Sequence, residues 1–289
     1  MRWTAWLVLF ATLLLWSGNW IVARAVRDDV APGMATMGRL LIVLAILLPF
    51  TLKGLLQKDL RSHWKVLVGL GIAGGGPHIA LQWLGLHYTT ATSGILYLST
   101  SPIFILLMAT PLAGERIALR QWLGVLLSLS GVVLIATHGE VHTVSFNVGD
   151  LMAVASMVMW AAYTVLLRMR RDDLNTPELI SVVCLIGCVF MLPWVAAELI
   201  LQRSVSLTGW GVAAVVYSAI GSMLLAYLGW SYVVTRLGAA RAGVTMHLVP
   251  AMGVVLAALF LAEYPQWYHF VGIGLILAGV RASLASSSR

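Results

Sequence analysis

The chain has 289 residues, of which 60% are hydrophobic and only 10% are charged, and its formal net charge is +7. Soluble domains contain about 25% charged and about 45–50% apolar residues, so this composition argues against a soluble enzyme and for a chain that folds in lipid. The positive charge does not indicate nucleic-acid binding, because the basic residues lie in short gaps between apolar runs and form no stripe on one helix face.

Ten apolar segments are long enough to cross a bilayer as helices, for which about 20 residues are needed. In chain order they cover residues 4–23, 32–52, 64–86, 91–111, 120–137, 149–168, 177–198, 209–234, 239–262 and 267–285. The first segment faintly resembles a signal peptide, but its length predicts a membrane span. Because the gaps leave no room for a soluble domain, the sequence predicts an all-α membrane protein with ten transmembrane helices.

The basic residues between the segments predict how the chain is oriented. If the N-terminus is cytoplasmic, fourteen Lys and Arg residues lie on the cytoplasmic side and three on the opposite side. The remaining one of the 18 basic residues, Arg39, lies well inside a segment. Since Lys and Arg are enriched on the cytoplasmic side of membrane proteins, we expect both termini there, in a bacterial inner membrane.

The second half of the chain repeats residues of the first half in the same order. The matched pairs are Pro102 and Pro250, Glu115 and Glu263, Gly124 and Gly272, Gly131 and Gly279, Trp16 and Trp160, and Arg24 and Arg168. Each half has five segments, an odd number, so the second copy enters the membrane upside down. Inverted repeats are typical of secondary transporters, whose substrate site lies where the repeats meet. We therefore predict repeats over residues 1–138 and 139–289 around a central cavity.

The residues that define this repeat also resemble a known family. Motifs at 16–20 (Trp-Ser-Gly-Asn-Trp), 114–116, 121–124 and 131–134, with the repeat of the pattern around Glu263 and Gly272, are similar to the drug/metabolite transporter superfamily. Within it the whole chain resembles the ten-span EamA-type branch, and more narrowly its aromatic amino acid exporters. The resemblance implies export by a basket of helices whose central cavity opens alternately to each side. It also implies that spans five and ten lie away from that cavity.

The strongest candidate for a substrate site is a predicted helix interruption in the third segment. The residues that weaken the helix are Gly74, Gly75, Gly76 and Pro77. Such interruptions often accompany binding sites in transporters. His78 and Gln82 lie four residues apart, so both project from one face beside the interruption. The competing interpretation is a close-packing glycine patch with a hydrogen-bonded histidine.

Polar and aromatic side chains in other segments extend this candidate site, since polar groups in a membrane tend to face protein or water. The further candidates are Trp16, Asn19, Tyr97, Ser99, Trp160, Tyr163, Tyr217, Tyr227 and His247, with Pro102 and Pro250 as helix breaks or gates. Aromatic rings hold apolar side chains and also cations such as an α-ammonium group. An aromatic site with neutral hydrogen-bonding groups favours an amino acid as the substrate.

The charged residues that are absent from the segments narrow the substrate further. No acidic residue lies in the middle of a segment, which disfavours proton exchange against cationic drugs. No cluster of Lys and Arg is present to bind phosphate. Arg39 is expected to have a structural role, with a substrate carboxylate as the alternative partner. Facilitated diffusion is the simplest hypothesis for the driving force, and a proton relay through His78 or His247 is the alternative.

Two other functions are compatible with a polytopic membrane protein. One is a transporter of another neutral metabolite or drug, with proton coupling. The other is a lipid-modifying enzyme, which needs a nucleophile, an acid–base pair or a metal site, but histidines and carboxylates do not cluster here, and Cys184 and Cys188 lack metal-binding partners. We therefore predict no catalytic residues, no metal and no cofactor. The expected partners are a small-molecule substrate and the bilayer, with no nucleic acid and no obligate protein partner.

Overall fold

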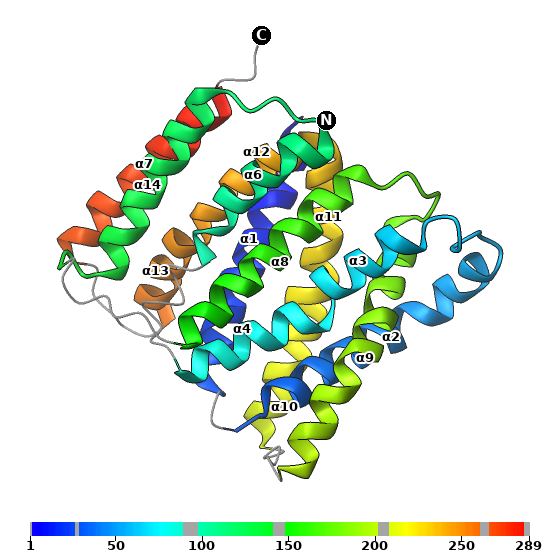
Figure 1. Cartoon of the computed structure of the whole chain (residues 1–289). Coiled ribbons are helices and arrows are strands. Elements are labelled where there is room, and N and C mark those ends of the chain that lie inside the picture. Colours follow the sequence, from blue (N-terminus) through cyan, green and yellow to red (C-terminus); the bar gives the residue numbers. More distant parts are fainter. Residues whose placement is uncertain are drawn as a thin grey trace.

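The computed structural model describes residues 2–26, 29–88, 98–140, 148–201, 208–260 and 266–285, and the regular structure in these ranges is entirely helical (Figure 1). The elements are α1 (Arg2–Ala25), α2 (Pro32–Leu56), α3 (Trp64–Gly74), α4 (Gly76–Tyr88), α6 (Ser101–Ala113), α7 (Leu119–Ala136), α8 (Val148–Met169), α9 (Thr176–Ile200), α10 (Gly209–Tyr217), η2 (Ser218–Leu225), α11 (Ala226–Leu237), α12 (Ala239–Val244), η3 (Thr245–His247), α13 (Leu248–Phe260) and α14 (Trp267–Ala285).

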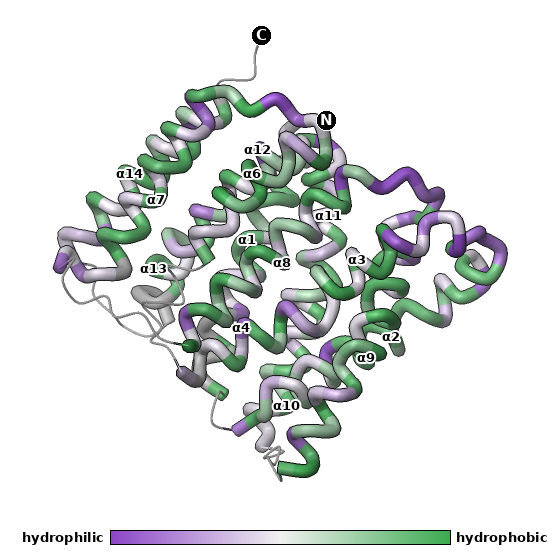
Figure 2. Tube along the Cα trace, viewed as in Figure 1, coloured by the Kyte–Doolittle hydropathy of each residue, from purple (hydrophilic) through white to green (hydrophobic). Residues whose placement is uncertain are grey.

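The helices carry apolar side chains on their outward faces as well as in the core. By length and composition, six described helices can cross a membrane: Pro32–Leu56, Val148–Met169, Thr176–Ile200, Gly209–Leu237, Ala239–Leu256 and Trp267–Leu284. Large apolar side chains are exposed on them, including Phe50, Val189 and Phe270. Hydrophilic residues gather instead in the connections α2–α3, α6–α7 and α8–α9 (Figure 2). A helical bundle with this surface is a multi-pass membrane protein.

Helices from the two halves of the chain alternate in the packing. α2 packs along α9, α4 along α8 and α1 along α11, while α7 and α14 form a pair at one edge of the bundle (Figure 1). Each described helix before residue 139 has its most extensive contacts with a helix after residue 139. The main hydrophobic core is therefore shared by both halves.

The α7–α14 pair is held together through four glycines. A Cβ on Gly124 would lie 2.5 Å from the carbonyl oxygen of Gly279, and a Cβ on Gly279 would lie 2.4 Å from the carbonyl oxygen of Gly124. Gly131 and Gly272 face each other in the same reciprocal way, at 2.4 and 2.7 Å. Small residues at these positions let two helix backbones touch, as is common between membrane helices.

The segment 64–86, expected to be one span, consists of two helices that meet at Gly75. A Cβ on Gly75 would lie 2.2 Å from the carbonyl oxygen of Gly71 and 3.0 Å from Cα of Gly187 in α9. The hydroxyl of Tyr227 donates a hydrogen bond of 2.8 Å to the carbonyl oxygen of Gly74, which ends α3. The glycines thus serve two purposes, since they interrupt the helix and allow α9 to approach its backbone.

Two further irregular helical stretches were not expected from the sequence. The segment 209–234 contains the π-helix η2, and the segment 239–262 contains the 3₁₀ turn η3. The π-helix leaves backbone carbonyl groups without their usual partners. One of them, the carbonyl oxygen of Ser222, accepts a hydrogen bond of 3.0 Å from Trp16 Nε1. Tertiary contacts of this kind are invisible to hydropathy.

The two prolines that we expected to act as helix breaks or gates each lie at the start of a helix. Pro102 lies in the first turn of α6, and Pro250 lies in the first turn of α13. Pro77 likewise lies in the first turn of α4. Proline is well tolerated in the first turn, where its missing N–H would have no partner within the helix.

Carboxylates at both ends of α9 fix it against α2 and its flanking loop. Glu198 accepts hydrogen bonds from the backbone N–H groups of Gly33 and Met34, at 2.8 and 2.9 Å, in the first turn of α2. At the other end Glu178 forms a salt bridge of 2.6 Å with Lys58, just beyond α2. Hydrogen bonds from free N–H groups at a helix start to a carboxylate are strong, because one partner is charged and the helix dipole adds to them.

Replacing Glu198 with alanine is expected to lower the free energy of unfolding by about 2–4 kcal/mol, because one buried and one partly buried N–H group lose a charged acceptor. Glu198→Gln keeps one acceptor and should lose about half as much. Unfolding of the purified protein by sodium dodecyl sulfate in mixed micelles measures the change. Asp173→Asn, in the α8–α9 connection, is the control and should unfold like the unmodified protein. Equal losses for Glu198→Ala and Asp173→Asn would contradict the capping role.

Candidate functional site

A cavity lies where helices of both halves meet, and it encloses about 480 Å³ of space not filled by atoms, including the part open to solvent. Its lining residues are Trp16, Asn19, Arg39, His78, Ile79, Gln82, Leu98, Met157, Trp160, Ser222, Tyr227, Met246 and Val249. They come from α1, α2, α4, α8, η2, α11, η3 and α13, and from the residue Leu98 that precedes α6. No lining residue belongs to α7 or α14, in keeping with what the resemblance implies for spans five and ten.

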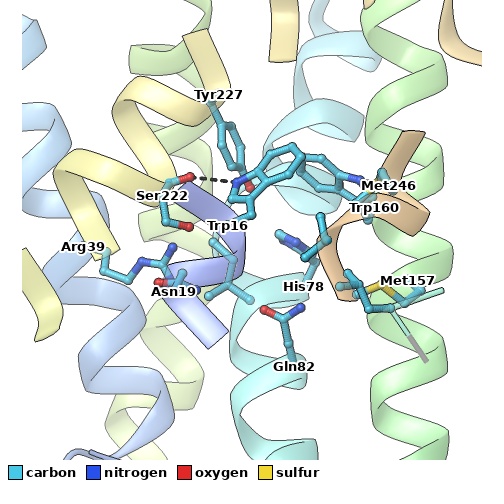
Figure 3. Close-up of a pocket in the computed structure, with 13 residues that line it drawn as sticks. Trp16, Asn19, Arg39, His78, Gln82, Met157, Trp160, Ser222, Tyr227 and Met246 are labelled. Atoms are coloured by element: carbon cyan, nitrogen blue, oxygen red, sulfur yellow. Dashed lines mark hydrogen bonds between the residues drawn. The ribbon is translucent and has the colours of Figure 1, made fainter. Parts of the chain in front are cut away.

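One wall of the cavity is a cluster of aromatic rings around Trp160 (Figure 3). The ring of Trp16 meets Trp160 edge to face, with 5.0 Å between the centroids, and Tyr227 does so at 5.5 Å. His78 stacks on Trp160 at 5.5 Å, with 26° between the ring planes. These separations fall in the range in which aromatic rings attract one another. The wall is thus a preformed apolar surface.

Three rings of this wall are fixed to irregular points of neighbouring helices. Trp160 Nε1 contacts Met246 Sδ at 3.0 Å in the 3₁₀ turn η3. Trp16 Nε1 donates to Ser222 in the π-helix, and Tyr227 donates to Gly74 at the end of α3. The polar atoms of these three rings are therefore engaged with the protein, whereas Nδ1 of His78 has no hydrogen-bond partner among the described residues. The irregular helical stretches therefore hold the aromatic wall in position.

The polar part of the cavity consists of Asn19, Gln82 and Arg39. Asn19 Oδ1 accepts a hydrogen bond from the hydroxyl of Ser218. Arg39 is only 2% exposed, and its Cζ lies 6.0 Å from the centroid of the Trp83 ring. Among the described residues, Nε and Nη1 of Arg39 have no hydrogen-bond partner. No Asp or Glu belongs to the described lining, so Arg39 makes this cavity electropositive.

The structure brings together six of the side chains predicted to bind substrate. The predicted residues that line the cavity are Trp16, Asn19, His78, Gln82, Trp160 and Tyr227. Tyr163 lies behind the wall, with its ring 5.2 Å from that of Trp160. Tyr217 lies outside the lining and donates a hydrogen bond of 3.1 Å to the carbonyl oxygen of Leu15. Tyr97 falls outside the described residues.

His247 and Ser99 were expected in the cavity, but neither belongs to its lining. His247 Nε2 is 2.8 Å from the carbonyl oxygen of Ser99, and Nδ1 is hydrogen bonded to the hydroxyl of Ser128 in α7. The 3₁₀ turn η3 places Met246 in the cavity lining, while His247 contacts α7. Both ring nitrogens of His247 have protein partners, which favours a structural role over proton relay.

Sequence reasoning missed several lining residues. Ile79, Leu98, Met157 and Val249 are apolar residues in apolar segments, and no local signal distinguishes them from the core. Arg39 did carry a signal, because it is the one basic residue well inside a span. Among the described residues, no group of three or more His, Cys, Asp or Glu is placed to hold a metal ion.

Comparisons with known proteins identify a family and several relatives. The profile of the EamA-like transporter family matches residues 3–137 and again residues 147–284. A protein of Archaeoglobus fulgidus, named "Uncharacterized transporter", is 29% identical over 282 residues, which are 96% of each chain. A protein of Escherichia coli K12, named "Probable amino-acid metabolite efflux pump", is 21% identical over 93% of this chain and 90% of its own.

A solved crystal structure has the same fold. It superposes with a TM-score of 0.79 at 23% sequence identity, covering 99% of this chain and 97% of the other. The family match covers nearly the whole sequence, and the relatives are named as transporters. The chain therefore belongs to the EamA-like transporter family, a branch of the drug/metabolite transporter superfamily, and it is a membrane transporter rather than an enzyme.

Proposed function

We propose that the protein exports amino acids, aromatic and other neutral ones, and similar small metabolites across the bacterial cytoplasmic membrane by alternating access. The observation that carries the proposal is the cavity, whose aromatic wall faces a small polar group of Asn19, Gln82 and Arg39. Like other small-molecule sites, it combines an apolar, aromatic lining with a small number of polar groups. The relative named as an amino-acid metabolite efflux pump supports the same substrate class and direction.

We further propose that ten spans form two inverted copies, over residues 1–138 and 139–289. Exchange of the two halves converts the packing of α4 on α8 into that of α11 on α1, and the packing of α6 on α8 into that of α13 on α1. The contact of Gly124 with Gly279 likewise becomes that of Gly272 with Gly131. The family profile matches once in each half. Two such copies around one cavity are the usual construction for alternating access.

The cytoplasmic side is assigned from charge. The N-terminus and the connections α2–α3, α6–α7 and α8–α9 emerge at the same end of the bundle (Figure 1). These connections hold Lys58, Arg61, Arg116 and Arg171. We place this end in the cytoplasm, following the usual enrichment of Lys and Arg on that side.

Counterflow in proteoliposomes tests the proposed substrate. Vesicles loaded with unlabelled amino acid are expected to accumulate labelled phenylalanine, tryptophan and leucine, with no accumulation in empty vesicles. A panel of purines and neutral drugs runs in parallel. Uptake of those compounds without counterflow of any amino acid would favour the alternative substrates. Because no Asp or Glu belongs to the described cavity lining, we expect no accumulation driven by a pH gradient alone.

Glu115 lies at the end of the bundle that we place in the cytoplasm, and it contacts the second half of the chain there. Its carboxylate oxygens accept hydrogen bonds from the backbone N–H groups of Ala239 and Ala240, at 2.9 and 3.0 Å, at the start of α12. Arg168 at the end of α8 lies 3.8 Å away. Glu115 follows α6, so these contacts join the first half of the chain to the second. We propose that they act as a cytoplasmic latch.

Replacing Glu115 with alanine is expected to favour the state that is open to the cytoplasm. A cysteine at Met157, in a background with Cys184 and Cys188 replaced by serine, reports access to the cavity. Its labelling by an impermeant maleimide, added to the cytoplasmic face of inside-out vesicles, should become about fivefold faster or more. Arg168→Gln should change the rate much less, because this ion pair is partly exposed. An unchanged labelling rate in Glu115→Ala would contradict the proposed role of Glu115 as a latch.

A further inference from the structure

Arg39 is a buried cation for which the described protein supplies no counter-ion. It lies in the second turn of α2, and its side chain points into the cavity rather than out to lipid or water. Because it is only 2% exposed, it does not reach the interface, and Nε and Nη1 find no acceptor among the described carbonyl, carboxylate or hydroxyl oxygens. Snorkelling and pairing of these nitrogens with a helix end, two structural roles for such a residue, are therefore not observed.

An unpaired charge in such a place is costly, so its position needs an explanation. Burial of an ion away from water costs several kcal/mol unless a partner offsets it. The Trp83 ring at 6.0 Å offers only a weak compensation at the edge of cation–π range. No acidic residue lies in the described lining. A bound anion would supply the missing partner, and a guanidinium group presents paired donors that match the two oxygens of a carboxylate.

The position of Arg39 relative to the aromatic wall suggests how such an anion is attached. In Figure 3, Arg39 enters the cavity on the left, from α2, whereas His78 and Met157 lie on the right. Trp16 and Trp160 lie above these side chains in the same view, in edge-to-face contact with each other. A molecule with a carboxylate at one end and an apolar or aromatic group at the other meets both Arg39 and the aromatic wall. Gln82, which also lines the cavity, adds a neutral acceptor for an ammonium group.

We propose that Arg39 binds the carboxylate of the transported solute and so makes a carboxylate a requirement for efficient transport. This inference rests on the proposed function, since it concerns the same cavity, and it defines the substrate class as amphipathic carboxylates, with amino acids among them. It also gives the bound solute a direction, with its carboxylate toward α2 and its side chain toward Trp160.

The experiment compares Arg39→Met, Arg39→Lys and the control Arg120→Met, which removes an exposed arginine. Counterflow is measured with L-phenylalanine and with L-phenylalanine amide, which keeps the ring and the ammonium group but lacks the carboxylate. Arg39→Met should reduce transport efficiency for phenylalanine about tenfold or more, because charge-assisted hydrogen bonds are lost. It should leave the amide nearly unaffected. Arg39→Lys should fall between, and Arg120→Met should match the unmodified protein.

A second measurement separates this inference from a structural role and from the proposed function. Arg39→Met should raise the melting temperature of the purified protein, since it removes an unpaired buried charge, whereas loss of a structural ion pair would lower it. Binding of 3-phenylpropionate, followed as a rise in melting temperature, should disappear in Arg39→Met. Such binding without counterflow of any amino acid would refute amino acid export and leave the anion site standing. Equal phenylalanine transport by Arg39→Met and the unmodified protein would refute the anion site.

Discussion

Replacing Trp160 with alanine is expected to reduce transport efficiency about 100-fold while the protein stays in the membrane. Trp160 contacts Trp16, His78 and Tyr227 in the cavity wall and touches Met246 through its indole nitrogen. Its removal takes away a stacking surface for the solute, and each aromatic pair contributes about 0.5–1.5 kcal/mol beyond the burial of its area. The wall loses its central member, so the neighbouring rings lose their fixed positions too.

Counterflow of phenylalanine measures this loss, with size-exclusion chromatography as the test of folding. Because Trp160→Ala also removes a large buried side chain, which costs about 3–5 kcal/mol of stability, Trp160→Phe is measured beside it. Trp160→Phe keeps a ring for stacking but loses the contact with Met246, and should lose about tenfold or less. Trp210→Ala, at a side chain that is 82% exposed, is the control and should transport normally. A folded Trp160→Ala that transports at the normal rate would show that solute does not use this cavity.

Gly75→Ala is expected to destabilise the protein strongly and to impair transport, although it adds a single methyl group. Its new Cβ would lie 2.2 Å from one carbonyl oxygen and 3.0 Å from the Cα of Gly187, and backbone atoms cannot turn aside as a side chain does. Overpacking of this kind costs about 1–3 kcal/mol and sometimes more. The displaced end of α3 carries the carbonyl group that holds Tyr227, so the aromatic wall moves with it.

Unfolding in mixed micelles and phenylalanine counterflow should both show the effect of Gly75→Ala. Gly274→Ala is the matched control, because a Cβ there meets nothing within 4 Å. In the middle of α14 alanine is also the better helix former, by about 1 kcal/mol. Gly75→Ala should therefore be less stable than the unmodified protein, and Gly274→Ala equal or more stable. If both variants were equally stable and active, the close approach of α9 at Gly75 would have no consequence.

The membrane class and the positions of most helices were predictable from the sequence, because hydropathy reports burial in lipid directly. The helix interruption at Gly74–Gly76 was also predictable, since glycine weakens a helix whatever surrounds it. The positions of η2 and η3 were not predictable in this way. Their irregular hydrogen bonding depends on partners distant in the chain, such as Trp16 for Ser222.

The candidate site was predictable where polar or aromatic residues interrupt apolar runs. Trp16, His78 and Trp160 stood out for this reason, and all three line the cavity. His247 shows the opposite case, because its chemistry suggested a site while the turn before α13 brings it against Ser128. Arg39 was recognisable as unusual, yet only the structure shows that its neighbours leave two of its nitrogens without a partner.

The glycine contacts between the two halves have a mechanical consequence. Where Gly75 meets Gly187, and where Gly124 meets Gly279, main chain rests on main chain, and no side chain is present that changes rotamer as the helices shift. Through such backbone contacts, we expect a shift of one helix to displace its neighbour directly. We therefore expect bending during the proposed transport cycle at η2 and η3, where hydrogen bonding is already irregular. These are the same stretches that hold the rings of Trp16 and Trp160. A change in the curvature of either stretch would therefore alter the grip on the solute directly.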